Sequence, residues 1–205
     1  LKLSRSPNGN ILTQVYLDAA QQAGYQINND MNGKNQEGFG LMDTTIYKGR
    51  RQSTSVTYLH PIIHRSNLKV LTNVTVNKII FENKRATGVE CNINGKSNKF
   101  YSNQEILLSA GAINSPHLLM LSGIGPENQL KEHDIEPVEC LEGVGENLQD
   151  HLETYVQYEC KKPVTLYSAQ NPIRMAFIGI EWFLFKSGIA ANSNLETGGF
   201  IKSNQ

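Results

Sequence analysis

Histidine and cysteine are the residue types in this sequence whose spacing could indicate chemistry most directly. The five histidines are His60, His64, His117, His133 and His151. The three cysteines are Cys91, Cys140 and Cys160. No histidine has a cysteine or acidic partner at metal-ligand spacing, and three widely spaced cysteines make neither a metal quartet nor a redox pair. We therefore predict no metal site, histidines with structural or surface roles, and reduced thiols such as cytoplasmic proteins contain.

Two further function classes are disfavoured by the sequence. An acyl hydrolase needs a Gly-x-Ser-x-Gly turn that presents its nucleophile after a strand, and no such turn is present. The pair Ser122–Gly123 ends a predicted helix instead of following a strand. Lysine plus arginine and aspartate plus glutamate both number 19, so no net charge favours binding to nucleic acid.

The most specific local pattern is a run of small residues around one short apolar helix, Ser109–Pro126 (SAGAINSPHLLMLSGIGP). Gly111 and the alanines beside it allow a tight turn after a buried strand at residues 106–108. Ser115 is expected as the N-cap, with Pro116 at the first helical position, buried leucines behind it and a glycine at the end. The amino end of such a helix, at the edge of a sheet, favours a negatively charged group.

The elements that position this turn follow from the spacing of apolar residues. Helices are predicted over residues 10–23, 56–65 with a break near Pro61, 127–133, and 175–185 as a buried amphipathic helix. Strands are predicted over residues 68–72, 76–82, 86–93 and 99–102, with a hairpin turn at Asn94–Gly95. The Asn- and Gly-rich residues 24–49 are predicted as a long ordered loop that lines a site. This order predicts an α/β fold, in which ligands bind beyond the carboxyl ends of parallel strands.

The whole run resembles a signature of the glucose–methanol–choline (GMC) family of flavin oxidoreductases. The slots of that signature are filled by Gly111–Ala112, Ser115–Pro116, Leu118–Leu119 and Ser122–Gly125. The stretch Gly143–His151 resembles the next landmark of the family. The resemblance extends over essentially the entire chain, which makes it far more specific than a single glycine motif.

The resemblance implies a mixed α/β fold that contains part of a Rossmann-like FAD-binding domain with a β-meander and part of an antiparallel-sheet substrate domain. In this interpretation residues 1–49 border the site, residues 50–151 form the middle of the FAD-binding domain, and residues 152–205 belong to the substrate domain. The resemblance also implies that FAD contacts the backbone of Val76 and the small pair Ala110–Gly111.

Three stretches, residues 36–43, 155–161 and 196–201, are most similar to family members that oxidise choline. The resemblance places Glu196 where those members have a carboxylate that faces the substrate. Because a quaternary ammonium group cannot donate a hydrogen bond, its recognition needs diffuse negative charge or aromatic faces. A half-buried carboxylate beside Phe or Trp supplies both. The implied reaction is oxidation of choline, or a similar small alcohol, by hydride transfer to FAD.

Two features of the family are not recognisable in the sequence, namely the glycine-rich phosphate loop and the catalytic histidine. Gly143–Leu148 lacks the third small residue, and Gly123–Pro126 follows a helix. We therefore expect an internal fragment that contains no catalytic residue, binds FAD weakly or not at all, and self-associates through open sheet edges. Another primary alcohol as substrate, and a non-catalytic binding module of the same fold, remain alternatives. The sequence leaves open whether oxygen or a respiratory acceptor takes the electrons.

Overall fold

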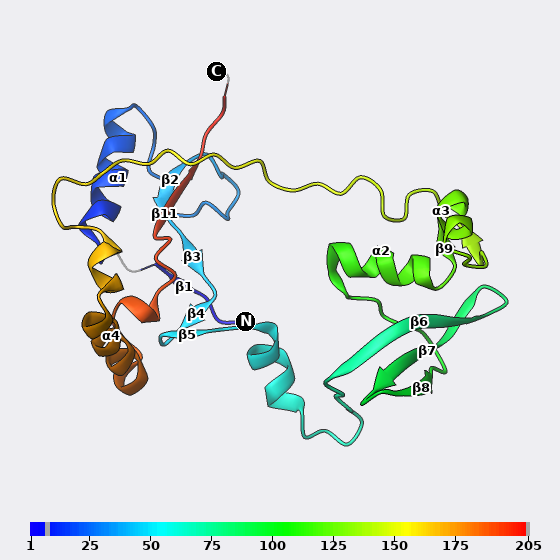
Figure 1. Ribbon diagram of the computed structural model, residues 1–205. Coiled ribbons are helices and arrows are strands. Elements are labelled where there is room, and N and C mark those ends of the chain that lie inside the picture. The colour runs from blue at the N-terminus through cyan, green and yellow to red at the C-terminus, as the bar shows by residue number, and fades with distance from the viewer. Residues whose placement is uncertain (7–8, 204–205) are drawn as a thin grey trace. The chain divides into compact units, whose positions relative to one another are not determined.

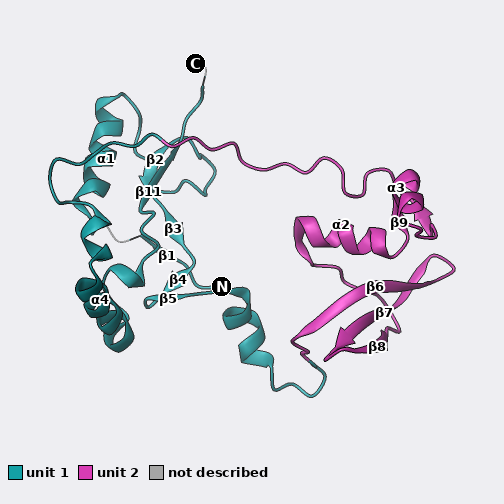
Figure 2. Cartoon of the chain, in the orientation of Figure 1, with its two compact units in different colours: residues 1–69, 156–205 teal, residues 70–155 magenta. Residues whose placement is uncertain are grey.

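The computed structural model describes residues 1–6 and 9–203 of the chain, so the last two residues of the predicted substrate domain lie outside the description. The chain divides into two compact units (Figure 2). The first unit contains residues 1–69 and 156–205, and the second contains residues 70–155. The first unit is thus assembled from two segments that are separated in sequence by the whole of the second.

The first unit combines helices with short strands (Figure 1). Its strands are β1 (Ser4–Arg5), β2 (Gly38–Leu41), β3 (Asp43–Thr44), β4 (Ile46–Tyr47), β5 (Arg50–Arg51) and β11 (Thr197–Phe200). Its helices are α1 (Ile11–Gln22), η1 (Ser55–Leu59), η2 (His60–Ile62), η3 (Leu166–Gln170), α4 (Pro172–Phe185) and η4 (Ile189–Ala191). The break between η1 and η2, just before Pro61, confirms the predicted interruption, because proline cannot donate a helical hydrogen bond.

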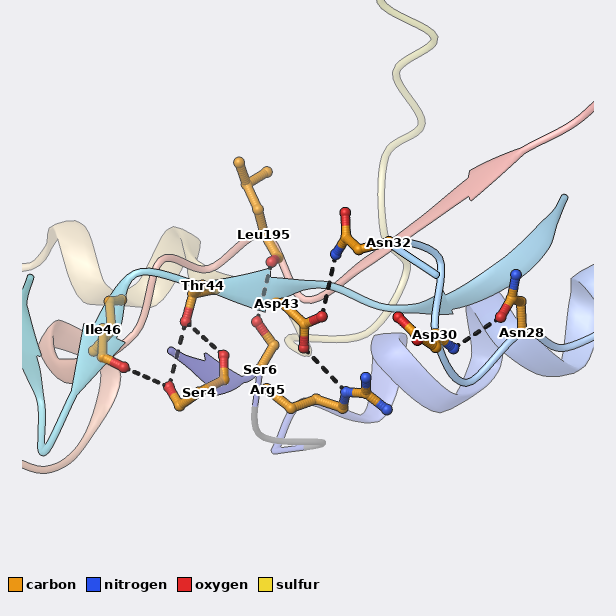
Figure 3. Close-up of polar contacts among 10 residues, drawn as sticks. All are labelled: Ser4, Arg5, Ser6, Asn28, Asp30, Asn32, Asp43, Thr44, Ile46 and Leu195. Atoms are coloured by element: carbon orange, nitrogen blue, oxygen red, sulfur yellow. Dashed lines mark hydrogen bonds and ion pairs between the residues drawn. The ribbon is translucent and has the colours of Figure 1, made fainter. Parts of the chain in front are cut away.

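Strand pairing in the first unit is mostly between distant segments. The strand β11 pairs antiparallel with β2, so that Thr197 lies opposite Leu41. The strand β1 pairs antiparallel with β3, and the Asp43 carboxylate accepts hydrogen bonds from Arg5 Nε and Asn32 Nδ2, each at 3.2 Å (Figure 3). Residues 24–49 therefore contain three strands, and the prediction of one long loop is wrong there. The Asn-rich residues 28–35 precede β2, and the single residues Met42 and Thr45 separate the three strands.

The helix α1 confirms the predicted helix at residues 10–23. Asn10 is its N-cap, and the Asn10 side chain accepts a hydrogen bond from the Leu12 backbone N–H at 2.9 Å. The buried residues are Thr13, Leu17 and Ala20, spaced at i, i+4 and i+7. The apolar side chain of Leu12 on the same helix is exposed. A polar threonine therefore lies on the buried face of the helix.

The second unit is organised around a three-stranded antiparallel sheet. Its order is β6 (Val74–Glu82), β7 (Arg85–Ile93) and β8 (Lys96–Tyr101). The turns Asn83–Lys84 and Asn94–Gly95 have positive φ at both residues, as two-residue hairpin turns require. The predicted meander is therefore confirmed.

The remaining elements of the second unit are two helices and two short parallel strands. They are α2 (Gly111–Leu121), β9 (Ile124–Gly125), α3 (Glu127–Glu132) and β10 (Glu139–Cys140). Leu130 on α3 is only 1% exposed, so it belongs to the core of this unit. The Lys84 Nζ atom lies 2.5 Å from Glu139 Oε2 and connects the first hairpin turn to β10.

The helix α2 begins one turn earlier than the sequence predicted. Its N-cap is Ala110, and Pro116 lies inside the helix. The Ser115 hydroxyl oxygen instead accepts a hydrogen bond from the Ala110 backbone N–H at 3.1 Å, so it still satisfies a group at the helix start. No residue of α2 is fully buried, so the prediction of buried leucines is wrong, and Leu121 is 42% exposed.

Two predicted strands are absent from the described residues. Residues 68–72 and 106–108 have extended or irregular backbone without strand pairing. Leu107 is 81% exposed, in contrast to its predicted burial in a parallel sheet. An apolar run becomes a strand only where a neighbouring strand accepts its backbone hydrogen bonds. The described residues supply no such partner to either segment.

The apolar segment at residues 175–185 forms most of α4, as predicted, but its side chains are not buried. Phe177, Phe183 and Phe185 are all about 70% exposed. The helix is tied to the β4–β5 hairpin by Trp182, whose Nε1 atom donates to the Gly49 carbonyl at 2.8 Å. Among the described residues, no helix has the length and apolarity that crossing a bilayer requires.

Candidate functional site

The candidate substrate residue Glu196 directly precedes β11, and its backbone is held on both sides. The Glu196 carbonyl accepts a hydrogen bond from Met42 N at 2.9 Å. The preceding carbonyl, of Leu195, accepts from the Ser6 hydroxyl at 3.3 Å (Figure 3). Ser6 is itself buried, and its backbone N–H donates to the Met42 carbonyl at 2.9 Å. The main chain at Glu196 therefore has a defined position in the first unit.

The Glu196 side chain is half-buried, so it is not the freely solvated glutamate expected at an ordinary strand end. Its Oε2 atom accepts a hydrogen bond from the hydroxyl of Thr13 on α1. Thr13 is 5% exposed and belongs to the buried face of that helix. The carboxylate is thus joined to a residue 183 positions away in the sequence.

A cavity of about 940 Å³ adjoins this carboxylate, entirely within the first unit. Its lining includes Thr13, Tyr16, Ser168, Arg174, Asn192 and Glu196. The aromatic residue in this lining is tyrosine, which stands where the sequence suggested Phe or Trp. The Tyr16 ring lies edge-on to Phe39, with ring centroids 5.7 Å apart. A carboxylate and an aromatic ring therefore line one cavity, which is the combination that favours an organic cation.

The charged groups of the cavity have different partners. Glu196 is bound by Thr13, whereas Arg174 Nη1 donates to the Ser168 hydroxyl at 2.6 Å. Sequence reasoning identified the glutamate and missed Thr13, Tyr16 and Arg174. The position of Thr13 in the i, i+4, i+7 pattern with Leu17 and Ala20 is the signal that could have placed it on a buried face.

In the second unit, the candidate cofactor residue Val76 lies on β6, an edge strand of the three-stranded sheet. It is 38% exposed and lies opposite Cys91. The register shifts between Val76 and Lys78, directly after this pair. Bulges of this kind re-aim backbone groups and are enriched next to binding sites. The backbone of β6 at Val76 therefore lies at the edge of the sheet, next to a register shift.

The second candidate, Ala110–Gly111, starts α2, which packs against β6. Gly111 has φ +87°, and a Cβ atom built on it meets no atom within 4 Å. The turn is thus open rather than filled by side chains.

The sequence at the carboxyl end of the same helix is explained by packing. The Ser122 hydroxyl accepts from Ile79 N at 2.8 Å and donates to the Leu118 carbonyl at 2.6 Å. This residue is buried and fastens α2 to the β6 edge. At Gly123, φ is +86° and a Cβ atom would lie 2.5 Å from the Glu136 carbonyl oxygen, so only glycine fits. Ser122 therefore fastens the carboxyl end of α2 to the sheet, at the opposite end of the helix from the open turn.

In the described part of the chain, no cluster of three or more His, Cys, Asp or Glu side chains could hold a metal ion. Cys91 is buried in the sheet, whereas Cys140 and Cys160 are exposed, and all three are free thiols.

Comparison with known proteins identifies close relatives along the whole chain. The chain is 52% identical over 204 residues to the protein named mitochondrial choline dehydrogenase of Homo sapiens, covering 99% of this chain and 34% of that protein. It is 48% identical over 204 residues to the oxygen-dependent choline dehydrogenase of Staphylococcus xylosus, covering 100% of this chain and 36% of that protein. The chain thus spans about a third of the length of these relatives.

Solved structures show the same fold. A formate oxidase matches 97% of this chain with 35% of its own, at a TM-score of 0.84 and 23% identity. An FAD-dependent oxidoreductase from Chaetomium thermophilum matches 94% of this chain with 35% of its own, at a TM-score of 0.78 and 26% identity. The family model described as GMC oxidoreductase matches residues 1–153, three quarters of the sequence. The chain therefore belongs to the GMC oxidoreductase family.

Proposed function

We propose that this chain forms part of an FAD-dependent oxidoreductase that oxidises choline to betaine aldehyde. The observation that carries the proposal is the identity of about 50%, over the whole chain, to proteins named choline dehydrogenase. The cavity beside Glu196 agrees with it, because its carboxylate and tyrosine ring suit a quaternary ammonium group.

The second unit would contribute to the cofactor site. When bound, FAD accepts the hydride that leaves the alcohol carbon. The residues fit a dinucleotide because the turn at Gly111 is open and precedes the helix α2, whose first N–H groups favour negative charge. Val76 would offer backbone groups on the edge strand β6. In this proposal residues 50–151 belong to the FAD-binding domain.

The first unit would contribute to the substrate site, with residues 1–49 bordering it and residues 152–205 in the substrate domain. The oxidation breaks one C–H bond and one O–H bond of choline and forms the aldehyde C=O bond, so that one hydride and one proton leave. Glu196 would attract the trimethylammonium group and orient the alcohol, without taking part in either transfer. We assign no residue of this chain as the base that accepts the proton.

The proposal is tested with the full-length product of the gene that encodes this chain. We expect flavin absorbance, oxidation of choline, and a much lower kcat/KM for 3,3-dimethylbutan-1-ol, the neutral isostere of choline.

The variant Glu196→Gln should raise the KM for choline about tenfold to a hundredfold, because it removes the charge while keeping the shape. It should change kcat less, since the carboxylate contributes mainly to ground-state binding.

A matched control is Glu159→Gln, which removes an exposed carboxylate of the first unit. It should leave the KM for choline unchanged. Equal use of choline and its neutral isostere by the wild-type enzyme would identify a general primary alcohol as the substrate and would remove Glu196 from the site. The 205-residue chain alone should show no stoichiometric flavin absorbance and no turnover of choline.

A further inference from the structure

The hydrogen bonds of the sheet fix the backbone at Glu196 but not the position of its carboxylate, which a further contact must hold. A glutamate side chain has three rotatable bonds between its backbone and its carboxylate. The hydrogen bonds at Glu196 O and Leu195 O leave these bonds free. Within the described residues, the hydrogen-bond donor to the carboxylate is the Thr13 hydroxyl.

Thr13 is well suited to fix that carboxylate. It lies in the first turn of α1, where its own N–H donates to the Asn10 carbonyl at 2.9 Å. It is β-branched, so its hydroxyl occupies few rotamers, and it is 5% exposed. The N-cap of Asn10 secures the same turn, because the Asn10 side chain accepts from Leu12 N at 2.9 Å. The hydroxyl of Thr13, which has few accessible rotamers, therefore restrains the more flexible side chain of Glu196.

The position of the Glu196 charge determines its effect on a quaternary ammonium ligand. The ammonium group of such a ligand has no N–H that could donate a hydrogen bond and so orient the carboxylate. The attraction then depends on the distance between the charges and on how far water screens them. The Thr13 hydroxyl binds Oε2 and leaves Oε1 without a hydrogen-bond partner in the described part of the chain. Both residues line the same cavity.

From this geometry we propose that Thr13 is a positioning residue for substrate selection, which holds the Glu196 carboxylate at the cavity wall so that it favours a cationic alcohol over a neutral one. The inference rests on the proposed function of Glu196 and adds a specificity role for a residue on a different helix. Thr13 acts through Glu196 and takes no part in the transfer of hydride or proton.

The test compares Thr13→Val, which is nearly isosteric but lacks the hydroxyl, with Thr13→Ser, which keeps it. In the full-length enzyme, Thr13→Val should raise the KM for choline about tenfold, the value of one hydrogen bond to a charged group. The inhibition constant of tetramethylammonium should rise by the same factor, because this probe has the charge but no alcohol. The KM for 3,3-dimethylbutan-1-ol should stay within about twofold, and Thr13→Ser should restore selectivity for choline.

Two outcomes would overturn the inference. One is an unchanged KM for choline in Thr13→Val; the second is an equal loss for choline and its neutral isostere, accompanied by a lower melting temperature in both Thr13 variants. If Glu196→Gln weakens choline binding while Thr13→Val does not, the proposed function stands and only the role of Thr13 fails. If neither variant affects choline binding, the roles of Glu196 and Thr13 both fail, whereas oxidation of choline by the wild-type enzyme would still support the proposed function.

Discussion

The two units differ in how far apart in sequence their paired segments lie. In the second unit, β6, β7 and β8 pair with their neighbours in the chain through two tight turns. In the first unit, β2 pairs with β11 across more than 150 residues, and Thr13 contacts Glu196 across 183. Closing so long a loop carries a larger entropy cost than closing a hairpin. The second unit is therefore the more locally determined of the two.

This difference separates the two halves of the proposed site. The candidate cofactor residues lie on a locally formed sheet and on the helix fastened to it by Ser122. The candidate substrate residue has a position that depends on Ser6, Thr13 and Met42, all from the opposite end of the sequence. Substitutions that disturb the meander or α2 should therefore affect the candidate cofactor residues. The position of Glu196 should instead depend on the pairing of segments that lie far apart in the sequence.

The largest effect is expected from Leu130→Ala, which removes a side chain that is 1% exposed in the second unit. Truncation of a buried leucine should lower the free energy of unfolding by about 3 kcal/mol, from lost burial and the cavity left behind. Hydrogen exchange followed by mass spectrometry should show faster exchange in residues 70–155. An equally faster hydrogen exchange in residues 1–69 would contradict this prediction, because it would show that the two units unfold together.

The control for this prediction is Leu107→Ala in the same unit. Leu107 is 81% exposed, so its truncation should change the free energy of unfolding by less than about 0.5 kcal/mol. A large loss at Leu107 would mean that residues 106–108 are covered in solution, as the sequence pattern indicated.

A smaller effect, of opposite sign in the two units, is expected from replacing two glycines by alanine. A Cβ atom has free space at both Gly111 and Gly179. Gly111 has φ +87°, so Gly111→Ala should destabilise the second unit by about 1–2 kcal/mol. Gly179 lies inside α4, so Gly179→Ala should stabilise the first unit by about 0.5–1 kcal/mol. Urea unfolding followed by circular dichroism measures both; stabilisation by Gly111→Ala would show that the turn is not held in this conformation.

The sequence predicted the locally determined features best. These are the hairpin turns, the break before Pro61 and the helix start at Asn10, each of which depends on residues within a few positions of one another. Strands 68–72 and 106–108 were predicted wrongly because strand formation requires a partner that the apolar pattern does not reveal. The strands within residues 24–49 were missed because their partners include β1 and β11, far away in the chain.

The candidate site shows the same limit. Glu196 was identified through resemblance; it is half-buried beside a cavity that Tyr16 lines, and its role stays a prediction. Thr13 was missed, although its spacing with Leu17 and Ala20 marks a buried face. A hydroxyl on such a face indicates a polar partner but does not identify it. That partner is known only once β11 has been placed against β2. The roles of Val76, Ala110 and Gly111 stay predictions.

The smallest effect is expected from an exposed ion pair on α3, which tests whether local pairs alone give the second unit its pH dependence. Lys131 Nζ lies 2.5 Å from Glu127 Oε1, and this hydrogen bond, with the charge of Lys131, holds the pKa of the Glu127 carboxyl below its usual value of 4.5. A pKa lowered by folding contributes stability above the unfolded pKa and loses it as the pH falls through the folded one. Glu127→Gln should therefore slightly lower the free energy of unfolding of the second unit at pH 7 and have no effect near pH 2.

The control is Glu132→Gln, on the same helix and without an ion pair among the described residues, which should show neither change. Because both side chains of the pair are at least half exposed, water and salt screen their attraction, and 1 M salt should abolish the difference at pH 7. A difference that persists in 1 M salt would mean that Glu127 has a role beyond this local pair.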